Sequence, residues 1–296
     1  MTGIQWTEET WNPTTGCDKV SPGCGLPRFD GDDTGGCYAM AMAKRLKGMG
    51  QAKYQNDGDP RTSGPGFGLT VHPDALDVPL RWREPRMVFV NSMSDLGHAR
   101  VPPEFLARVW AVMAATPRHT YQILSKRPGR IAAWVNRCQQ WDGYITHNGK
   151  PSPAYDGTGV IVGRPESWPL PNVHLGTTVE LDRYCQRADS LRETPAAVRF
   201  LSLEPLLGPL PSLDLTGIDW AIIGGESGSG AREMDLGWAR DLRDRCREAG
   251  TAVFVKQLGS RWAAKNGGHA KGGDWDRWPE DLKIREFPRT AGTVAA

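Results

Sequence analysis

Three cysteines near the N-terminus are the residues of this chain best suited to chemistry. Cys17, Cys24 and Cys37 follow the spacing C-x6-C-x12-C and lie among turn-forming glycine and proline residues, just before the helix-like stretch Tyr38–Lys47. Such a loop can fold back so that several thiolates reach one centre, and a following helix N-terminus favours negative charge. Three thiolates suit an iron–sulfur cluster with one iron open to a ligand, because structural zinc takes four protein ligands. The spacing therefore predicts a cluster.

Two other interpretations of these cysteines stay open at this point. They could be small buried hydrophobic residues, although turn-rich sequence makes burial hard to arrange, or they could bind zinc. The remaining cysteines, Cys138, Cys185 and Cys246, fall inside helix-like segments. For those three we expect a place in the core and no metal.

Composition narrows the class of protein. The chain has 296 residues with 39% hydrophobic content, and its 36 basic residues against 34 acidic ones give a net charge of +2. This is enough for a large α/β core, and any contact with nucleic acid must be local because the protein is no generic polycation. Six cysteines are too few for a disulfide scaffold, and the sequence shows no signal peptide or membrane span. We expect a cytoplasmic protein without a membrane partner.

Short apolar runs alternate with helix-like segments along the chain. The runs are Met87–Val90, Tyr121–Leu124, Val173–Val179, Val198–Leu201, Trp220–Ile223 and Ala252–Val255. The helix-like segments are Pro103–Ala115, Pro128–Arg137, Leu181–Arg192 and Leu236–Ala249. Buried parallel strands read as continuous apolar runs, and their alternation with helices predicts an α/β fold, a partial or full βα (TIM-like) barrel.

Long insertions interrupt this alternation. Residues 48–68 and 139–171 are rich in glycine, proline and polar residues, and we expect lids or flexible insertions there. The barrel with its cysteine loop is expected to span residues 1–258. Residues 259–296, with cations among tryptophans, are expected to form a C-terminal flap and tail that either packs on the barrel or binds single-stranded nucleic acid.

Polar residues follow each apolar run. Because the carboxyl ends of parallel strands carry the chemistry of βα barrels, we expect these residues to line one cavity that faces the cysteine loop. Any single one of them could instead cap a helix. Together they offer both signs of charge, which suits a zwitterionic ligand. The residues are Asn91, Ser92, Asp95, Lys126, Glu180, Glu204, Glu226 and Lys256, with Gly224 and Gly225 in a tight turn before Glu226.

Several motifs resemble one known protein family. They are Trp6-Thr7, Trp11-Asn12-Pro13, Thr15-Gly16-Cys17, Val20-Ser21-Pro22-Gly23-Cys24, Cys37-Tyr38-Ala39, Val90–Leu96, Leu124–Pro128, Leu201–Leu206, Gly224–Gly228 and Phe254–Gln257. The chain resembles a phage- and bacteria-encoded three-cysteine-motif family of uncertain function, which is radical-SAM-like and distantly similar to spore photoproduct lyase. It departs from the radical-SAM pattern in its longer cysteine spacing, in Gly36 before the third cysteine, and in the late position of Gly-Gly-Glu.

The resemblance implies an activity and its cofactors. It implies a [4Fe–4S] cluster on Cys17, Cys24 and Cys37, with S-adenosylmethionine on the open iron and an external electron donor. Reductive cleavage would then give a 5′-deoxyadenosyl radical that acts on DNA, RNA or a nucleotide, in repair or modification. We expect cofactor contacts from Tyr38, Asn91, Ser92, Glu180, Gly224, Gly225 and Glu226. Catalytic roles are expected for Asp95, Lys126, Glu204 and Lys256.

Two alternatives belong to other functional classes. In the first, a cluster or zinc staples the N-terminal loop of a non-catalytic nucleic-acid-binding module. In the second, the protein is a hydrolase that uses Asp95, Glu180, Glu204 or Glu226 as acid or base, but the sequence has no histidine-rich ligand set to support a metal hydrolase. Binding of S-adenosylmethionine separates the first alternative from a radical enzyme.

Overall fold

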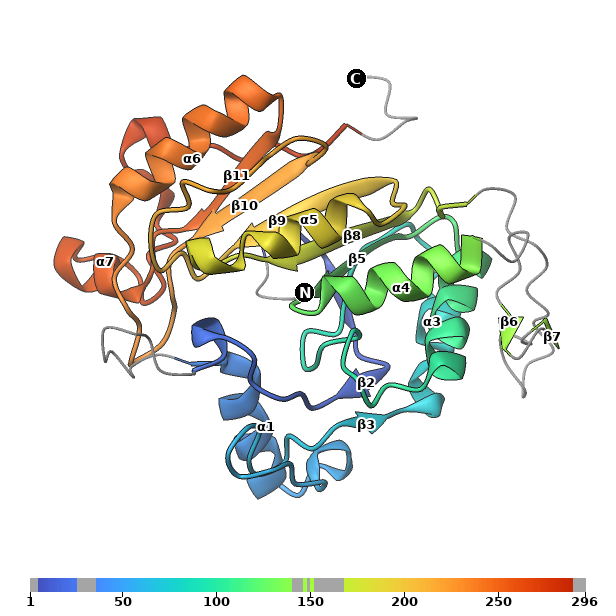
Figure 1. Ribbon diagram of the computed structural model, residues 1–296. Helices are drawn as coiled ribbons and strands as arrows, with labels where there is room; N and C mark the ends of the chain where they lie inside the picture. The colour runs from blue at the N-terminus through green and yellow to red at the C-terminus, as the bar shows by residue number, and fades with distance from the viewer. Residues whose placement is uncertain (1–4, 26–35, 140–145, 148–149, 152–167, 290–296) are drawn as a thin grey trace. The chain divides into compact units, whose positions relative to one another are not determined.

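A computed structural model describes residues 5–25, 36–139, 146–147, 150–151 and 168–289. The chain forms two compact units (Figure 1). The first unit contains Met1–Asp18, Ala39–Leu175 and Glu193–Ala197. The second contains Lys19–Tyr38, Gly176–Arg192 and Val198–Ala296. The first cysteine therefore belongs to one unit and the other two belong to the second.

Parallel strands form the centre of the first unit. Their order is β1-β4-β5-β8, and the pairs β1/β4 and β4/β5 are parallel. The bounds are β1 Glu9–Trp11, β4 Met87–Val90, β5 Thr120–Ser125 and β8 Val173–Thr178, and the chain passes into the second unit within β8. In register, Phe89 of β4 stands between Thr10 of β1 and Gln122 of β5. The last three residues of β4 are buried, as expected of an apolar strand inside a sheet.

Helices and short strands complete the first unit. Helix α3 is apolar through most of its length and buries eight residues, which places it in the core. The helices are α1 Tyr38–Gly48, η2 Ala52–Tyr54, η3 Pro73–Ala75, α2 Val78–Arg81, α3 Pro103–Ala115 and α4 Pro128–Gln139. The antiparallel pairs are β2 Thr14–Thr15 with β3 Thr70–Val71, and β6 Thr146–His147 with β7 Lys150–Pro151.

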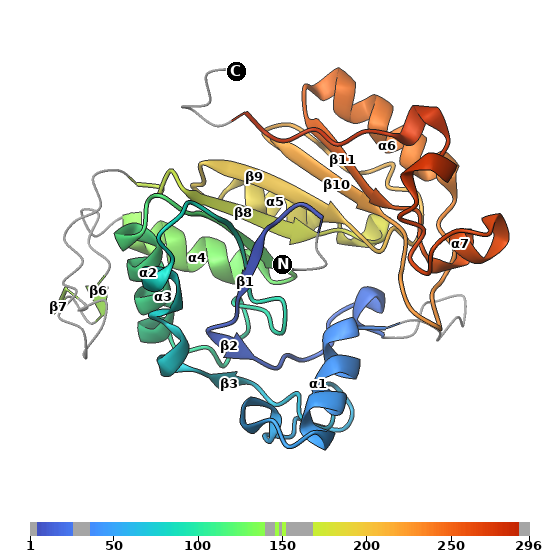
Figure 2. The same cartoon turned by 180° about the vertical axis from the view of Figure 1, so that it is seen from behind.

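The second unit repeats the parallel arrangement. Its strands follow the order β8-β9-β10-β11, with β9 Val198–Leu203, β10 Trp220–Gly224 and β11 Ala252–Gln257, and β10 is parallel to both neighbours. Every residue of β10 is buried, as in a central strand covered on both faces. The α-helices are α5 Gln186–Arg192, α6 Leu236–Ala249 and α7 Ser260–Asn266 (Figure 2). The 3-10 helices are η1 Pro22–Cys24, η4 Asp182–Tyr184, η5 Trp275–Arg277 and η6 Glu280–Leu282.

The C-terminal region packs within this second unit. Arg285 forms an antiparallel bridge with Phe254 of β11, and the backbone N–H of Val255 donates to the carbonyl of Ile284 at 2.9 Å. Trp262 and Trp278 are buried. These contacts attach the described part of residues 259–296 to β11. The expected boundary at residue 258 stays a prediction.

The strand expectations are confirmed at all six apolar runs, and the mixed α/β class with parallel strands is confirmed with them. This is compatible with a partial βα barrel. A full barrel is not confirmed, because β1 and β11 each have one neighbour among the described strands. Strand β1 could not be predicted from the sequence, because its three residues are too few to show an apolar run or an alternating pattern.

One helix expectation is confirmed only in part. The segment Leu181–Arg192 is no continuous helix: Leu181 is extended, a 3-10 turn follows, and α5 begins only at Gln186. The carboxylate of Asp182 accepts hydrogen bonds from the backbone N–H and hydroxyl of Ser212, both at 2.8 Å. This tertiary contact holds the turn, and local periodicity cannot report it. The other three helix-like segments form helices.

The expected insertions differ in what can be described. Most of residues 139–171 lies outside the described part of the chain, and two short strands are seen within it. Residues 48–68 are described in full.

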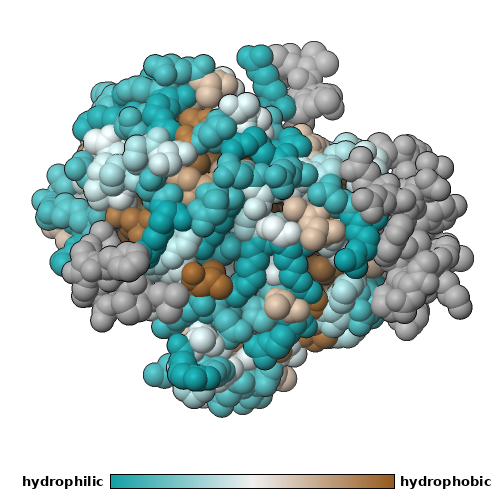
Figure 3. All heavy atoms as spheres, viewed as in Figure 1, coloured by the Kyte–Doolittle hydropathy of each residue, from teal (hydrophilic) through white to brown (hydrophobic). Residues whose placement is uncertain are grey.

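On the face shown in Figure 3, hydrophilic residues predominate and hydrophobic ones lie scattered. Among the described residues, no helix combines the length and apolarity needed to cross a membrane.

Candidate functional site

Cys17 follows a backbone position that only glycine can occupy. Gly16 has a positive φ of 84°, and a Cβ added there would lie 2.3 Å from the carbonyl oxygen of Gly68. The Gly16 N–H donates to Met93 at 2.9 Å, and the Cys17 N–H donates to Phe67 at 3.3 Å. The insertion at residues 48–68 thus packs against the backbone of the first cysteine.

Arg127 points its guanidinium at the sulfur of Cys17. Its Nη1 lies 3.2 Å from Cys17 Sγ and donates to Asp95 Oδ2 at 2.8 Å, while Nη2 donates to the carbonyl of Asp18 at 2.9 Å. Asp95 is fixed in turn by Ser125, whose hydroxyl donates to Oδ1 at 2.6 Å. Burial opposes the charge of Arg127, but Asp95 and Cys17 together raise the pKa of Arg127 above its usual value. A permanent cation therefore stands beside this sulfur.

Asp18 ties the insertion to the first cysteine. Its carboxylate accepts hydrogen bonds from Thr62 at 2.8 Å, from Ser63 at 3.0 Å and from His98 at 2.8 Å. Burial raises the pKa of Asp18, but the hydrogen bonds from Thr62, His98 and Ser63 outweigh it and lower that pKa to about 2. The insertion therefore supports the cysteine loop, a role that its composition did not indicate.

Asn91 and Ser92 lie at the end of β4, as expected. Asn91 is buried with a positive φ of 64°, which is rare outside glycine, and its amide donates to the Thr14 hydroxyl at 2.9 Å. Ser92 donates to the side chain of Asn12 at 3.2 Å. Both residues therefore brace the chain that leads to Cys17. Contacts with a cofactor stay a prediction for them.

A buried ion pair holds the turn that carries Cys24. The residue before it, Gly23, donates its N–H to Glu180 Oε1 at 3.4 Å. Glu180 is fully buried, and its Oε2 pairs with Arg187 Nη1 at 2.9 Å. A Cβ on Gly23 would lie 3.2 Å from Glu180, so glycine permits the approach. Glu180 follows β8, and Arg187 lies in α5.

A second buried ion pair holds the residue before Cys37. Gly36 donates its N–H to Glu226 Oε1 at 3.3 Å. Glu226 also binds Arg232 through both oxygens, with Nη2 at 2.6 Å and Nε at 2.8 Å, and the side chains are 5% and 1% exposed. Arg232 Nη2 reaches the carbonyl of Pro22 at 3.0 Å. The Glu226–Arg232 pair therefore contacts a residue shortly before Cys24 and the residue immediately before Cys37.

Arg232 retains a buried donor without a partner. Its Nη1 shares the outer end of the guanidinium with Nη2, the atom that contacts Pro22, and it has no hydrogen-bond partner among the described residues. An unsatisfied buried donor costs about 1–3 kcal/mol, more when it is charged. A negative group beside the turn Pro22–Cys24 would satisfy it.

The Gly-Gly-Glu turn makes room for a third ion pair. Lys256 Nζ lies 2.9 and 2.8 Å from the two oxygens of Glu204, and these residues belong to the ends of β11 and β9 on either side of β10. A Cβ on Gly224 would come within 3.2 Å of Glu204, and one on Gly225 would lie 2.5 Å from the carbonyl of Leu258. The side chains of Glu204 and Lys256 are 16% and 20% exposed, so solvent or a ligand can reach this pair.

The remaining expected residues are distributed as follows. Tyr38 is 56% exposed at the start of α1, and the backbone N–H of Lys126 donates to Asp95 at 3.1 Å. The first unit contains Asn91, Ser92, Asp95 and Lys126, and the second contains Glu180, Glu204, Glu226 and Lys256. Most of these eight lie within two residues after a strand end, whereas Asp95 lies five residues after β4 and Lys256 is the penultimate residue of β11. One cavity shared by all of them stays a prediction.

Sequence reasoning missed Arg187 and Arg232. They lie seven and six residues after Glu180 and Glu226. Neither spacing is a standard helical or strand pairing, so no local rule joins them to their carboxylates. The available signal was indirect: a buried carboxylate after a strand requires a cation nearby.

The cysteines differ in chemical character. Burial raises the pKa of both Cys185 and Cys246 to about 12, so these thiols stay protonated. Cys17, Cys24 and Cys37 are only half-buried. Cys138 lies in α4, and its side chain is outside the described part of the structure. No group of three His, Cys, Asp or Glu residues forms a ready metal site among the described residues.

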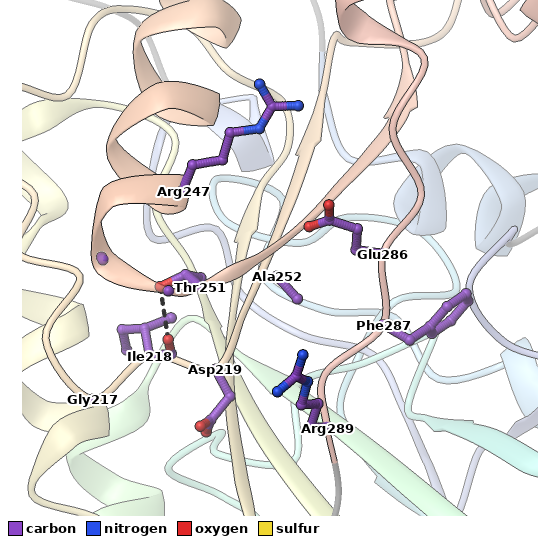
Figure 4. Close-up of a pocket in the computed structure, with 11 residues that line it drawn as sticks. Gly217, Ile218, Asp219, Arg247, Thr251, Ala252, Glu286, Phe287 and Arg289 are labelled. Atoms are coloured by element: carbon purple, nitrogen blue, oxygen red, sulfur yellow. Dashed lines mark hydrogen bonds between the residues drawn. The ribbon is translucent and has the colours of Figure 1, made fainter. Parts of the chain in front are cut away.

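A cleft of about 840 Å³ lies elsewhere in the second unit. It is lined by Asp219 and Thr251, which immediately precede β10 and β11, and by the exposed arginines Arg247 and Arg289 (Figure 4). Parallel α/β proteins place their chemistry at the carboxyl ends of strands. The cleft is at the opposite ends, so it is separate from the residues that hold Cys24 and Cys37.

A sequence model of one protein family matches residues 1–281. The chain belongs to the DUF5131 family. The family is described as proteins of unknown function. No curated protein and no solved structure matches the chain. Membership extends through the cysteine loop and all the strand ends that carry candidate residues, so these features fall within the family's own region.

Proposed function

We propose that this DUF5131 protein is an iron–sulfur enzyme in which Cys17, Cys24 and Cys37 together bind a [4Fe–4S] cluster. The observation that carries the proposal is the charged hydrogen bond from Arg127 to Cys17 Sγ at 3.2 Å. Hydrogen bonds to ligand sulfurs are a principal means by which proteins tune such clusters. A neutral thiol sulfur is only a weak acceptor, whereas a metal-bound thiolate would accept a charge-assisted hydrogen bond from this cation.

The donor set fits a cluster in two further respects. The half-buried thiols contrast with Cys185 and Cys246, whose raised pKa makes them poor ligands. The unpartnered Nη1 of Arg232 calls for negative charge beside the turn of Cys24, and a thiolate-bound cluster supplies it. Structural zinc would need a fourth protein ligand, for which the loop offers no further cysteine.

The cluster's chemistry follows from the resemblance to radical-SAM proteins. When bound and reduced, it would supply the electron that cleaves S-adenosylmethionine to a 5′-deoxyadenosyl radical. We propose Glu204 and Lys256 as the pair that handles protons or polar groups at the reacting end, because they remain partly exposed at the ends of β9 and β11, on either side of β10. Asp95 and Lys126 complete the proposed catalytic set, with a nucleic acid or nucleotide as substrate.

The first test is metal content. Anaerobically reconstituted protein should be brown, with about four iron and four sulfide per chain. Replacing Cys17, Cys24 or Cys37 by Ser should remove most of the iron, because three thiolates are the minimum for this cluster. Cys185→Ala and Cys246→Ala serve as matched controls and should leave iron unchanged. Zinc without sulfide would overturn the cluster, and loss of iron in a control variant would show that the ligands were wrongly chosen.

The second test is S-adenosylmethionine. Titration calorimetry on reconstituted protein should show binding to wild type and none to the cysteine variants, because the open iron is the expected anchor for its amino and carboxylate groups. Reduction with dithionite should then release 5′-deoxyadenosine. Protein that carries an intact cluster but binds no S-adenosylmethionine would contradict the radical-enzyme proposal. It would favour a cluster-stapled nucleic-acid-binding module instead.

A further inference from the structure

Each of the three cysteines has its own carboxylate–arginine pair. Asp95–Arg127 reaches the sulfur of Cys17, Glu180–Arg187 accepts the N–H before Cys24, and Glu226–Arg232 accepts the N–H before Cys37. The three carboxylates follow β4, β8 and β10. In each case a carboxylate–arginine pair contacts a cysteine or the residue before it, through the arginine at Cys17 and through the carboxylate at Gly23 and Gly36.

We infer that these pairs are positioning residues that hold Cys17 and the described residues beside Cys24 and Cys37 in place before any metal binds. The inference rests on the proposed function for its purpose, but the positioning itself is a property of the metal-free chain. Many small metal sites order only when the ion arrives, and binding then carries the cost of ordering the loop. Here the fixed carboxylates would order the residues beside the cysteines during folding, before a metal binds.

The chemistry of the pairs supports this role over a merely stabilising one. Buried ion pairs are weak sources of stability, because desolvation offsets much of their attraction. Glu180 is fully buried and Glu226 is 5% exposed, yet each uses an oxygen to accept a backbone N–H from the cysteine segment. Arg187 binds the second oxygen of Glu180, and Arg232 binds both oxygens of Glu226, so each carboxylate is held in one orientation toward the N–H that it accepts. The arginines therefore orient the carboxylates, and the carboxylates orient the loop.

The arginine side also contributes directly. Arg232 contacts the carbonyl of Pro22 as well as Glu226, so it connects the backbone before Cys24 to the pair that holds Gly36. Arg127 contacts both the sulfur of Cys17 and the carbonyl of Asp18. Both contacts use the fork of donors that lysine lacks.

The test compares full-length variants in which a whole pair becomes apolar. Glu180→Leu/Arg187→Leu and Glu226→Leu/Arg232→Leu remove both charges at once, so no unpaired buried charge remains and the fold should survive. Arg232→Lys is the milder variant, which keeps the charge and loses the fork. The matched control is Arg240→Gln/Asp281→Asn, a surface pair in the same unit with both side chains 42% exposed.

Hydrogen exchange on the metal-free proteins decides the positioning. In Glu180→Leu/Arg187→Leu, amide exchange at residues 21–25 should be about tenfold faster than in wild type. In Glu226→Leu/Arg232→Leu, the same increase is expected at residues 36–40. The control variant should match wild type at both segments. Because Arg232 also contacts Pro22, its variants should loosen both segments, with a smaller effect for Arg232→Lys. Unchanged exchange in folded double variants would overturn the inference.

Iron release connects the positioning to the cluster. After reconstitution, both double variants should lose iron to a chelator about tenfold faster than wild type, in line with the effect of outer residues on metal affinity. Equal release rates would leave the proposed cluster standing and overturn its dependence on the pairs. Wild-type protein that takes up neither iron nor sulfide would overturn the proposed function, and the exchange data would still decide the positioning.

Discussion

At the scale of single residues, small side chains and fixed charges decide what the strand ends can hold. Gly224 lies against Glu204, where an added Cβ would come within 3.2 Å of the side chain that pairs with Lys256. Gly225 lies against the carbonyl of Leu258. The Gly-Gly-Glu motif is thus explained by close approach at both glycines and by the bonds that Glu226 makes to Arg232 and Gly36.

Gly225→Ala should destabilise the protein by about 1–3 kcal/mol, because its Cβ would lie 2.5 Å from the buried Leu258 carbonyl oxygen and the backbone would have to move. Gly48→Ala is the matched control, since a Cβ at the end of α1 meets nothing within 4 Å. Alanine there should be neutral or slightly stabilising. Urea unfolding measures both. A stability loss for Gly48→Ala equal to that for Gly225→Ala would show that the close contact is not the cause.

At the scale of elements, the helices differ in how their ends are satisfied. Helix α6 begins after Asp235, whose carboxylate accepts the N–H of Gly237 at 2.7 Å, and it ends at Gly250 with a positive φ of 73°. Helix α3 starts instead with Pro102 and Pro103, which have no N–H to satisfy. Helix α3 is stabilised mainly by its buried apolar residues. Helix α6 buries only three residues, so its capping interactions contribute a larger share of its stability.

Asp235→Ala should therefore lower the free energy of unfolding by about 0.5–2 kcal/mol, the usual cost of losing an N-cap. Asp235→Ser keeps a side-chain oxygen at the same place and should recover most of the loss. Thermal or urea unfolding followed by circular dichroism gives both values. If Ser and Ala destabilise equally, the cap bond does not contribute as described.

At the scale of the whole molecule, buried histidines contribute to the loss of stability in acid. Burial lowers the pKa of His174 to about 4, and burial is also the first cause of the lowered pKa values of His72, His98 and His119. In the unfolded chain the pKa of histidine is near its ordinary value of 6.5. The unfolded chain therefore binds protons at pH values where these histidines stay neutral in the folded chain. Stability is then fully present above about pH 6.5 and falls as the pH decreases.

For His174 alone, the window runs from about pH 6.5 down to about pH 4, and the loss approaches roughly 3 kcal/mol at its lower end. The free energy of unfolding, measured in urea at several pH values, should decline across this window in wild type. His174→Leu should show a shallower decline, because it has no proton to gain on unfolding. A wild-type stability that stays level from pH 7 to pH 4.5 would contradict this account.

The sequence alone determined the strands and the residues that follow them. Six apolar runs are long enough to define buried strands without tertiary information, and polar residues after such runs must lie at strand ends. It also separated the loop cysteines from Cys185 and Cys246, because turn residues and helical periodicity are local signals.

Only the tertiary structure decided how these residues are paired. The contact of Arg127 with Cys17 joins positions 110 residues apart, and that of Glu226 with Gly36 joins positions 190 apart. The turn at Asp182 likewise contacts Ser212, and the helix expected from Leu181 begins only at Gln186. Local patterns report burial and backbone preference, whereas the partner of a buried charge is set by which strand ends the fold brings together.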